Sequence, residues 1–168
     1  RIAELLETDQ AAVLEANALD VAAGEAAGLD AYYLERLGLS PERMRGIAAD
    51  TRGVANLPDP IGEIIEGRTL PNGIQLLKRR VPLGVVACIY ESRPNVTVDI
   101  AALCLKSGNA AVLRGGQEAQ HTQRALGELI QRGLRDAGVP GDAVQVVSDP
   151  DRAHIDDLEI HDCDIFAT

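Results

Sequence analysis

The sequence predicts an α/β fold in which a partial Rossmann-type parallel sheet follows a group of helices and a β-hairpin arm. Three observations lead to this class. Helical periodicity dominates residues 1–55, two short strand patterns flank a turn signal between about residues 62 and 80, and residues 81–148 alternate strand and helix. A βαβαβ order implies parallel strands that are joined by right-handed crossovers.

The first 55 residues carry helix signals of two kinds. Gly28 is placed to close the first helix before a new start at Asp30, and Ser40-Pro41-Glu42 combines an N-cap, a first-turn proline and a first-turn acid. One apolar stripe at helical spacing runs through the first helix. Its members are Ile2, Leu5, Leu6, Val13 and Leu14. The sequence therefore predicts a helix from the start of the chain to Gly28 and another over 41–50.

The rest of the chain alternates strand and helix patterns. Pro71-Asn72-Gly73 predicts the turn of a hairpin with strands over 62–70 and 73–80. Apolar runs predict buried strands over 81–90, 110–113 and 143–147, and Gly108 is expected to end the helix before the second of them. A further helix is expected over about 120–137, because apolar residues form one stripe along it.

Two of the predicted strands end in groups suited to a ligand. The first breaks into Glu91-Ser92-Arg93-Pro94-Asn95, and the second ends in Arg114-Gly115-Gly116. Open α/β sheets place their ligands beyond the carboxyl ends of the strands. These two segments therefore predict half of a site for a phosphate-bearing cofactor.

Composition excludes several classes of function. The chain has 168 residues and a formal net charge of −10, which argues against a nucleic-acid partner or an anionic membrane surface. No apolar run approaches the roughly 18 residues that a membrane span needs. Three cysteines, an odd number, indicate free thiols rather than a disulfide framework. We expect a soluble cytoplasmic domain whose start at Arg1, inside a helical pattern, has been trimmed.

Four segments in order resemble one known family. VPLGVV, YESRPNVTVD, LCLKSGNA and LRGG, which fall between residues 81 and 116, are together similar to gamma-glutamyl phosphate reductase of the aldehyde dehydrogenase superfamily. The resemblance covers about residues 1–153 and implies an aldehyde-dehydrogenase-like fold, of which this chain is the N-terminal part of the NADP-binding domain, without the catalytic domain. It also implies NADPH-dependent reduction of L-glutamyl 5-phosphate to L-glutamate 5-semialdehyde in proline biosynthesis.

The resemblance assigns the second strand end to the adenosine half of the cofactor. Aldehyde dehydrogenases place a Lys at the comparable strand end and a Glu three residues later, and both contact the ribose. Here those positions hold Arg114 and Gln117, with Glu118 one residue further, so the pattern favours NADP(H). Gly115 and Gly116 are expected to let the backbone approach the cofactor. The alternative for Arg114 is an ion pair with a surface acid.

The first strand end is assigned, by the same resemblance, to the nicotinamide half. Glu91, Ser92 and Pro94 are then cofactor-binding residues, and Asn95 stabilises an oxyanion. The alternative for Asn95 is to cap the following helix, a role for which Thr97 is a second candidate. Arg93 would receive the acyl phosphate or the carboxylate of the substrate, or would pair with Asp99.

The family's reaction needs a cysteine thiolate, and this chain is not expected to supply it. The family places that cysteine far downstream. Cys88 and Cys104 lie within apolar runs, and acidic neighbours would raise the pKa of Cys163. The chain is therefore expected to be inactive alone. It would then be a nucleotide-binding fragment or an interaction module without a ligand.

Residues 154–168 form an acidic tail that departs from the family pattern, and the sequence explains no part of that departure. His154, His161 and Cys163 within it do not have a metal-binding spacing, so no metal site is predicted. The hairpin of residues 62–80 corresponds, by the resemblance, to a region of oligomer contacts. A homo-oligomer is therefore expected.

Overall fold

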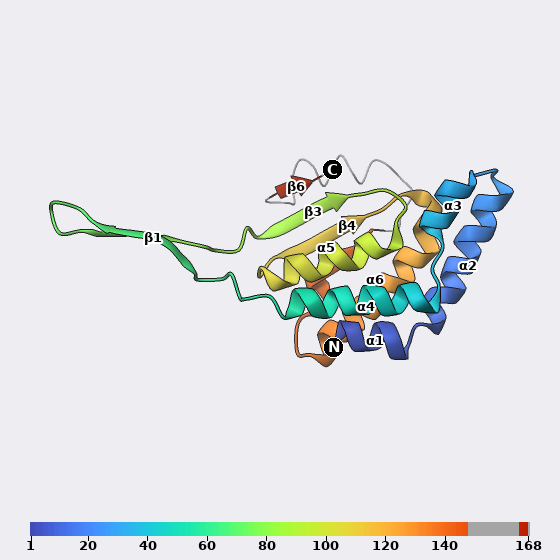
Figure 1. Cartoon of the computed structure of the whole chain (residues 1–168), viewed down its shortest axis with the longest axis horizontal. Helices are drawn as coiled ribbons and strands as arrows, with labels where there is room; N and C mark the ends of the chain where they lie inside the picture. Colours follow the sequence, from blue (N-terminus) through green and yellow to red (C-terminus); the bar gives the residue numbers. More distant parts are fainter. Residues whose placement is uncertain (148–164, 168) are drawn as a thin grey trace.

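The structure is a computed structural model that describes residues 1–147 and 165–167. It consists of an α/β body and a long two-stranded arm that projects from it (Figure 1). Its helices are α1 Ile2–Thr8, α2 Ala11–Ala26, α3 Ala31–Leu37, α4 Pro41–Ala55, α5 Pro94–Lys106 and α6 Gln120–Asp136, with 3-10 turns η1 Gln117–Ala119 and η2 Gly141–Ala143. Its strands are β1 Ile64–Thr69, β2 Gln75–Arg79, β3 Val85–Ile89, β4 Ala110–Arg114, β5 Val144–Val146 and β6 Ile165–Ala167.

The body contains a parallel sheet with the strand order β5-β4-β3-β6. Successive crossovers through α5 and α6 carry the chain from β3 to β4 and then to β5, as the alternation of patterns predicted. β6 then returns to the other side of β3, where Ala87 is the partner of Phe166. The chain therefore reverses direction across the sheet at β3, which is the kind of position where open α/β sheets bind ligands.

β6 changes the interpretation of the C-terminal residues. The sequence predicted only a divergent tail over 154–168, but Ile165–Ala167 forms a strand of the sheet. A strand there is stabilised because β3 otherwise presents an unpaired edge. His154, His161 and Cys163, which we weighed as metal ligands or as a nucleophile, lie outside the described residues.

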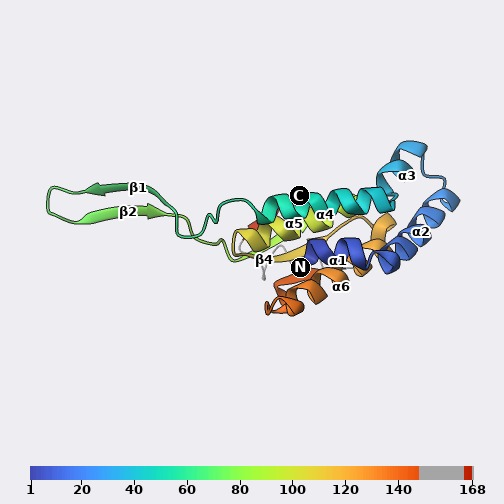
Figure 2. The same ribbon diagram turned by 60° about the horizontal axis from the view of Figure 1, so that its bottom comes forward.

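α1, α4, α5 and α6 form two layers on one side of the sheet, and α2 and α3 lie at one end of the body (Figures 1 and 2). α5 and α6 contact the strands, α1 and α4 pack on these two helices, and α2 packs on α6. The core between the layers includes Leu6, Met44, Leu113 and Ile130, which are fully buried. The apolar stripe predicted for residues 120–137 is the face of α6 that contributes to this core.

Several predicted helix boundaries are confirmed. Ser40 accepts from the Arg43 amide at the start of α4, and Asp30 accepts from the Tyr33 amide at the start of α3. Gly28 and Gly108 have positive φ angles of 77° and 74° just after α2 and α5. The prediction of one continuous first helix was wrong, because the chain leaves the helical conformation at Asp9 and α2 starts at Ala11.

A buried polar network fixes α2 against the start of α6. Asp20, only 2% exposed, accepts hydrogen bonds from the amide and the hydroxyl of Thr122 at 2.8 and 2.6 Å and from the His121 amide at 3.2 Å. Asn17 donates to the Thr122 hydroxyl and to the Leu37 carbonyl. The network thus satisfies donors in the first turn of α6, which helices leave without partners of their own. It also ties together segments about a hundred residues apart.

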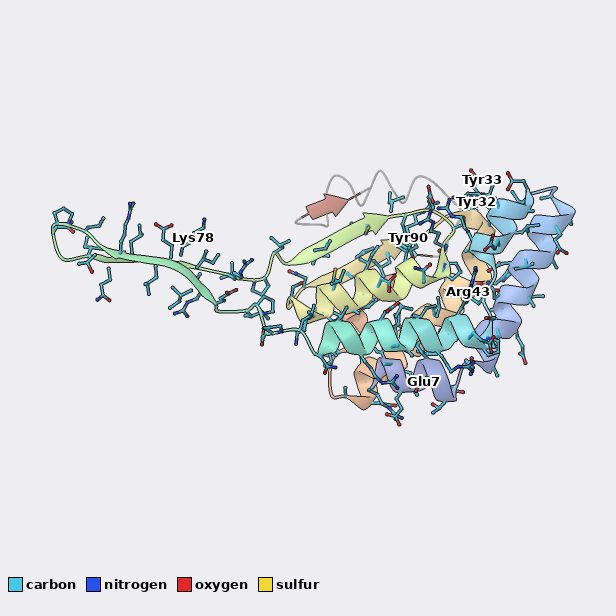
Figure 3. All side chains as sticks on the ribbon, in the orientation of Figure 1. Glu7, Tyr32, Tyr33, Arg43, Lys78 and Tyr90 are labelled. Atoms are coloured by element: carbon cyan, nitrogen blue, oxygen red, sulfur yellow. The ribbon has the colours of Figure 1, made fainter. Side chains whose placement is uncertain are left out.

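The arm has none of this burial. β1 and β2 form an antiparallel pair in which every residue is exposed, and their side chains stand free on both sides (Figure 3). The turn lies where Pro71-Asn72-Gly73 predicted it. The Gly73 amide donates to the Leu70 carbonyl at 2.9 Å, and Gly73 has a φ of 88°. Pro71 suits the second position of such a turn because its ring fixes φ near −65°.

Candidate functional site at the carboxyl ends of β3 and β4

The loops after β3 and β4 meet beyond the ends of the two strands. Ile89 is the register partner of Arg114, and the Tyr90 amide donates to the Arg114 carbonyl at 3.0 Å. One step further, the Ser92 hydroxyl donates to the Glu118 carboxylate. The two segments that the sequence singled out are therefore adjacent, because parallel neighbours end at the same edge of a sheet.

A hollow of about 400 Å³ lies at this junction. The loop after β3 and the loop after β4 line one part of it, and α3 lines the other. Its lining residues are Leu29, Tyr33, Arg36, Leu37, Glu91, Ser92, Arg93, Gly116 and Glu118. The contribution of α3 was missed by the sequence analysis, because nothing in the spacing of Tyr33 and Arg36 connects them with a loop that follows more than fifty residues later.

Glu91 is held by two arginines inside this hollow. Its carboxylate forms an ion pair with Arg36 of α3 and a second one with Arg93 at 3.3 Å. Arg36 also lies over the Tyr32 ring, 5.0 Å from its centre, and donates to the Tyr32 hydroxyl at 2.9 Å. The hydrogen bond with Glu91 raises the pKa of Arg36 above its ordinary value. The alternative pairing of Arg93 with Asp99 is wrong.

Among the described residues, no carboxylate pairs with the buried Arg114 side chain. It is 9% exposed, and its Nε has no hydrogen-bond partner among the described residues. No ion pair to Arg114 occurs within the described ranges, so the alternative of a surface acid as its partner has no support there. A buried donor without an acceptor is costly. An anionic oxygen would satisfy it.

The two glycines after Arg114 are required by the protein's own packing. A Cβ on Gly115 would lie 2.2 Å from Gln123 Nε2, and a Cβ on Gly116 would lie 2.0 Å from the Ser92 hydroxyl. Gln123 in turn accepts from the Gly115 amide and donates to the Gly116 carbonyl. Side chains of this chain therefore fill the space that we expected the glycines to leave for a cofactor.

The acid that the loop after β4 contributes to the hollow is Glu118 and not the residue at the spacing taken from aldehyde dehydrogenases. Glu118 lines the hollow, whereas Gln117 does not. The hydrogen bond from Ser92 is the main cause that lowers the pKa of Glu118. A carboxylate, ionised at neutral pH, is thus available beside the glycines to accept hydrogen bonds from hydroxyl groups.

The start of α5 corrects the alternatives for Asn95. The N-cap of α5 is Arg93, which makes no side-chain cap hydrogen bond, and Pro94 is the first helical residue. Asn95 lies in the first turn, and its amide donates to Asp99 at 3.2 Å. Thr97 is fully buried and bonds the Tyr90 hydroxyl at 2.8 Å. Neither Asn95 nor Thr97 caps the helix. Burial raises the pKa of Tyr90 to about 12 and also raises the pKa of Asp99.

The described cysteines are poor nucleophiles. Cys88 is half-buried in β3 and Cys104 is buried in α5, and both are free thiols. Burial raises the pKa of each thiol, which lowers the fraction of reactive thiolate at neutral pH. This agrees with their predicted structural role.

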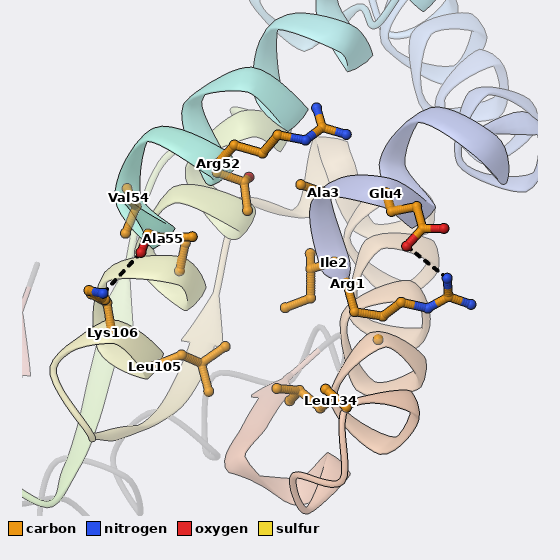
Figure 4. Close-up of a pocket in the computed structure, with 14 residues that line it drawn as sticks. Arg1, Ile2, Ala3, Glu4, Arg52, Val54, Ala55, Leu105, Lys106 and Leu134 are labelled. Carbon is orange, nitrogen blue, oxygen red and sulfur yellow. Dashed lines mark hydrogen bonds and ion pairs between the residues drawn. The ribbon is translucent and has the colours of Figure 1, made fainter. Parts of the chain in front are cut away.

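A larger hollow of about 660 Å³ lies elsewhere, between α1, α4, α5 and α6 (Figure 4). It shares no lining residue with the hollow at the strand ends. Its polar groups already have partners: Lys106 donates to the Ala55 carbonyl at 2.9 Å, and Arg1 pairs with Glu4 at 2.9 Å. We therefore place the candidate site at the strand ends, where the polar groups of two loops converge.

The described residues offer neither a metal site nor a membrane-spanning helix. No group of three or more His, Cys, Asp or Glu side chains there is arranged to hold a metal ion. Within the same part of the chain, every helix is too short or too polar to cross a bilayer.

Comparison with solved structures identifies the class. Propionaldehyde dehydrogenase from Rhodopseudomonas palustris has the same fold over 99% of this chain, with a TM-score of 0.66 at 19% identity. Gamma-glutamyl phosphate reductase from Thermotoga maritima matches with a TM-score of 0.88 at 36% identity, over 92% of this chain and 37% of that one. The chain thus shares its fold with the corresponding parts of both enzymes.

The relatives found by sequence comparison carry one name. Gamma-glutamyl phosphate reductase from Roseiflexus castenholzii is 58% identical over 152 residues, and that from Escherichia coli O1:K1 is 51% identical over 158 residues. No protein-family model matches the chain. The chain is a relative of the gamma-glutamyl phosphate reductases along 90–94% of its own residues, and it spans only 36–38% of the length of these relatives.

Proposed function

We propose that the chain forms part of the cofactor-binding domain of an NADP-dependent gamma-glutamyl phosphate reductase. Such an enzyme would reduce L-glutamyl 5-phosphate to L-glutamate 5-semialdehyde and phosphate. The observation that carries the proposal is the junction after β3 and β4, where the hydrogen bond from Ser92 to Glu118 joins two loops that border one hollow. Relatives at 51–58% identity that bear the reductase name support the assignment of this junction.

The residues present fit a dinucleotide in two respects. Arg114 does not line the hollow, but its buried Nε lacks an acceptor among the described residues, which suits a phosphate; Glu118 lines the hollow and offers a carboxylate, which suits ribose hydroxyls. When bound, the nicotinamide group would supply the hydride for the reduction. Arg114 would favour NADPH, whereas Glu118 would oppose a 2′-phosphate placed next to it. We propose NADP(H) because Nε of Arg114 is buried and lacks an acceptor among the described residues.

The choice of cofactor can be tested at Arg114. Arg114→Ala should weaken the binding of NADPH by about ten- to a hundred-fold and leave the binding of NADH nearly unchanged. The reason is that a charge-assisted hydrogen bond contributes about 1.5–3 kcal/mol. The measurement is calorimetric titration of both cofactors into the chain and into a full-length relative that carries this segment. Equal losses for both would show that Arg114 holds the fold or the ribose.

Glu118→Gln is the counterpart of that variant. If Glu118 faces the 2′ position of the adenosine ribose, its neutralisation should strengthen the binding of NADPH relative to that of NADH. Arg132→Ala serves as the matched control, because Arg132 pairs only with Asp9 among its described ion pairs and lies on α6 outside the hollow. A change in cofactor preference in the control would point to net charge rather than to this site.

The chain as it stands should lack turnover. The described thiols are buried or half-buried, and their pKa is raised. The assay is NADP⁺ reduction with glutamate semialdehyde and phosphate, run beside the variant in which Cys88, Cys104 and Cys163 are all Ser. Turnover in the parent chain that is absent from the triple variant would mean that one of these thiols is the nucleophile. Absence of turnover with NADPH binding retained would favour a nucleotide-binding fragment.

The remaining assignments concern the substrate, the partners and the location. We propose Arg93 as a substrate-binding residue and Asn95 as an oxyanion donor, because both border a second hollow of about 540 Å³ next to the first. We propose a cytoplasmic location, which the free thiols of Cys88 and Cys104 support.

Self-association through the arm is the other candidate function. Ile64, Ile74 and Leu77 are 51%, 56% and 51% exposed on an isolated strand pair, and two strands alone are marginal in water. A homo-oligomer would bury them. Sedimentation at micromolar concentration should give a species larger than a monomer, and Ile64→Lys with Ile74→Lys should dissociate it. A clean monomer before and after the change would contradict the proposal.

A further inference from the structure

Two arginines that border the hollow at the strand ends are both paired with Glu91. Arg36 and Arg93 reach the same carboxylate from different elements, α3 and the β3–α5 loop. The Glu91 side chain is 72% exposed, so it can turn into solvent. The two guanidiniums would then stay in place. Arg36 would remain, because its side chain is only 21% exposed and also contacts Tyr32.

We propose that Arg36 and Arg93 form an oxyanion-binding subsite and that Glu91 occupies it until an anionic group of the substrate displaces it. The ligand chemistry is a carboxylate or a phosphoryl group on a small molecule. This inference rests on the proposed reductase function, whose substrate carries both groups. It assigns to Arg36 a role that the sequence analysis did not consider and to Glu91 a role other than cofactor binding.

The geometry supports displacement in three ways. Both guanidiniums border the hollow of about 400 Å³ and also its neighbour of about 540 Å³, so an anion in either reaches them. The planar guanidinium suits two-point recognition of carboxylate and phosphate oxygens. The other acid of the first hollow, Glu118, is engaged by Ser92 and does not compete for the arginines in the structure.

The cost of displacing Glu91 is small enough for binding to overcome it. Ion pairs with an exposed partner contribute little, because water solvates the freed carboxylate. Glu91→Gln removes the competing charge and keeps the size of the side chain. It should therefore tighten anion binding by about three- to tenfold, and Arg36→Lys, which keeps the charge but loses the fork of donors, should weaken it by a similar factor.

The test is a titration of the chain with inorganic phosphate and, separately, with L-glutamate at matched ionic strength. The side-chain ¹⁵Nε resonances of Arg36 and Arg93 report binding directly. A response to phosphate alone assigns the subsite to the acyl phosphate, and a response to glutamate alone assigns it to a carboxylate. Glu63→Gln is the matched control, since Glu63 pairs with Arg80 at 2.8 Å beside the arm and should change neither titration.

Two results would overturn the inference. One is that the Glu91→Gln variant binds phosphate and L-glutamate with the same affinities as the parent chain. The other is that the Arg36→Lys variant binds these anions as tightly as the parent chain. NADPH titration of the same variants separates this outcome from failure of the proposed function, because the cofactor would still bind if only the subsite were wrong. Loss of NADPH binding with the anion response intact would instead count against the cofactor site alone.

Discussion

The arm and the sheet contain strand pairs of similar length and opposite environment. β1 and β2 are antiparallel neighbours in sequence, and every side chain is exposed. β3 and β4 are parallel, are separated by α5, and bury Ala87, Ala111 and Leu113. The turn and the backbone hydrogen bonds set the register of the first pair. The second depends on helices that cover one face, so the same substitution should have different consequences in the two.

The largest difference is expected for a leucine in each pair. Leu113→Ala should lower the free energy of unfolding by about 2–5 kcal/mol, because it leaves a cavity in a packed core. Leu77→Ala should change it by less than about 0.5 kcal/mol in the monomer, since Leu77 is already half exposed. Urea denaturation of both variants measures the contrast. Similar losses would mean that the arm is buried in solution, as self-association requires.

A smaller difference is expected for two aspartates that accept from backbone amides. Asp20→Ala should cost at least about 2 kcal/mol, because each buried donor left without a partner costs about 1–3 kcal/mol. Asp59 accepts from the Ile61 amide at 2.9 Å at the exposed base of the arm, and Asp59→Ala should be nearly neutral, because water replaces it. Thermal unfolding followed by circular dichroism compares them. A neutral Asp20 variant would contradict the role of the buried network.

Two glycines should respond to alanine for different reasons. Gly115→Ala should cost about 1–3 kcal/mol, because the new methyl group meets Gln123 and Tyr90. Gly73→Ala should cost about 1 kcal/mol, because φ is 88° although the surrounding space is open. Replacement of Gly73 by Asn, which tolerates this conformation, should recover most of the loss. Gly115→Ser should recover none of the loss seen in Gly115→Ala. The denaturant midpoints of the four variants test both statements.

The smallest effect is expected from the titration of Glu118. The hydrogen bond from Ser92 lowers its pKa below the ordinary 4.5, so its contribution to stability is present above that pH and is lost as the pH falls through the folded value. Because the group is mostly exposed, the contribution is below about 1 kcal/mol. Ser92→Ala should raise the pKa of Glu118 and flatten this part of the stability profile. NMR titration of the carboxyl group would show no shift if the contact is absent in solution.

The sequence predicted the elements well where the signal is local. The cap at Ser40, the turn at Gly73 and the strand–helix alternation after residue 81 all lie within a few residues of their causes. The break at Asp9 was missed because the apolar stripe continues across it. The strand at 165–167 was missed because the pairing of those residues with β3 depends on a neighbour about eighty positions earlier.

The site was predicted in part for the same reason. Residues at the two strand ends were found because the carboxyl ends of parallel strands meet, which is a rule about neighbouring elements. Arg36 was not found, because only the packing of α2 and α3 brings it to Glu91. The interpretation of Gly115 and Gly116 as a ligand cradle also needed correction, since the positions of Gln123 and Ser92 decide what occupies the space beside them.

The amino-acid sequence by itself determined the order of helices and strands, the turn of the arm, the net charge of −10 and the resemblance to the reductase family. These properties follow from local propensities, hydrophobic periodicity and total charge. Tertiary structure alone decided that Glu91 lies between Arg36 and Arg93, that Asp20 satisfies the start of α6, and that β6 pairs with β3. Such contacts join residues that are far apart in the chain, and their positions are set by how the buried faces pack.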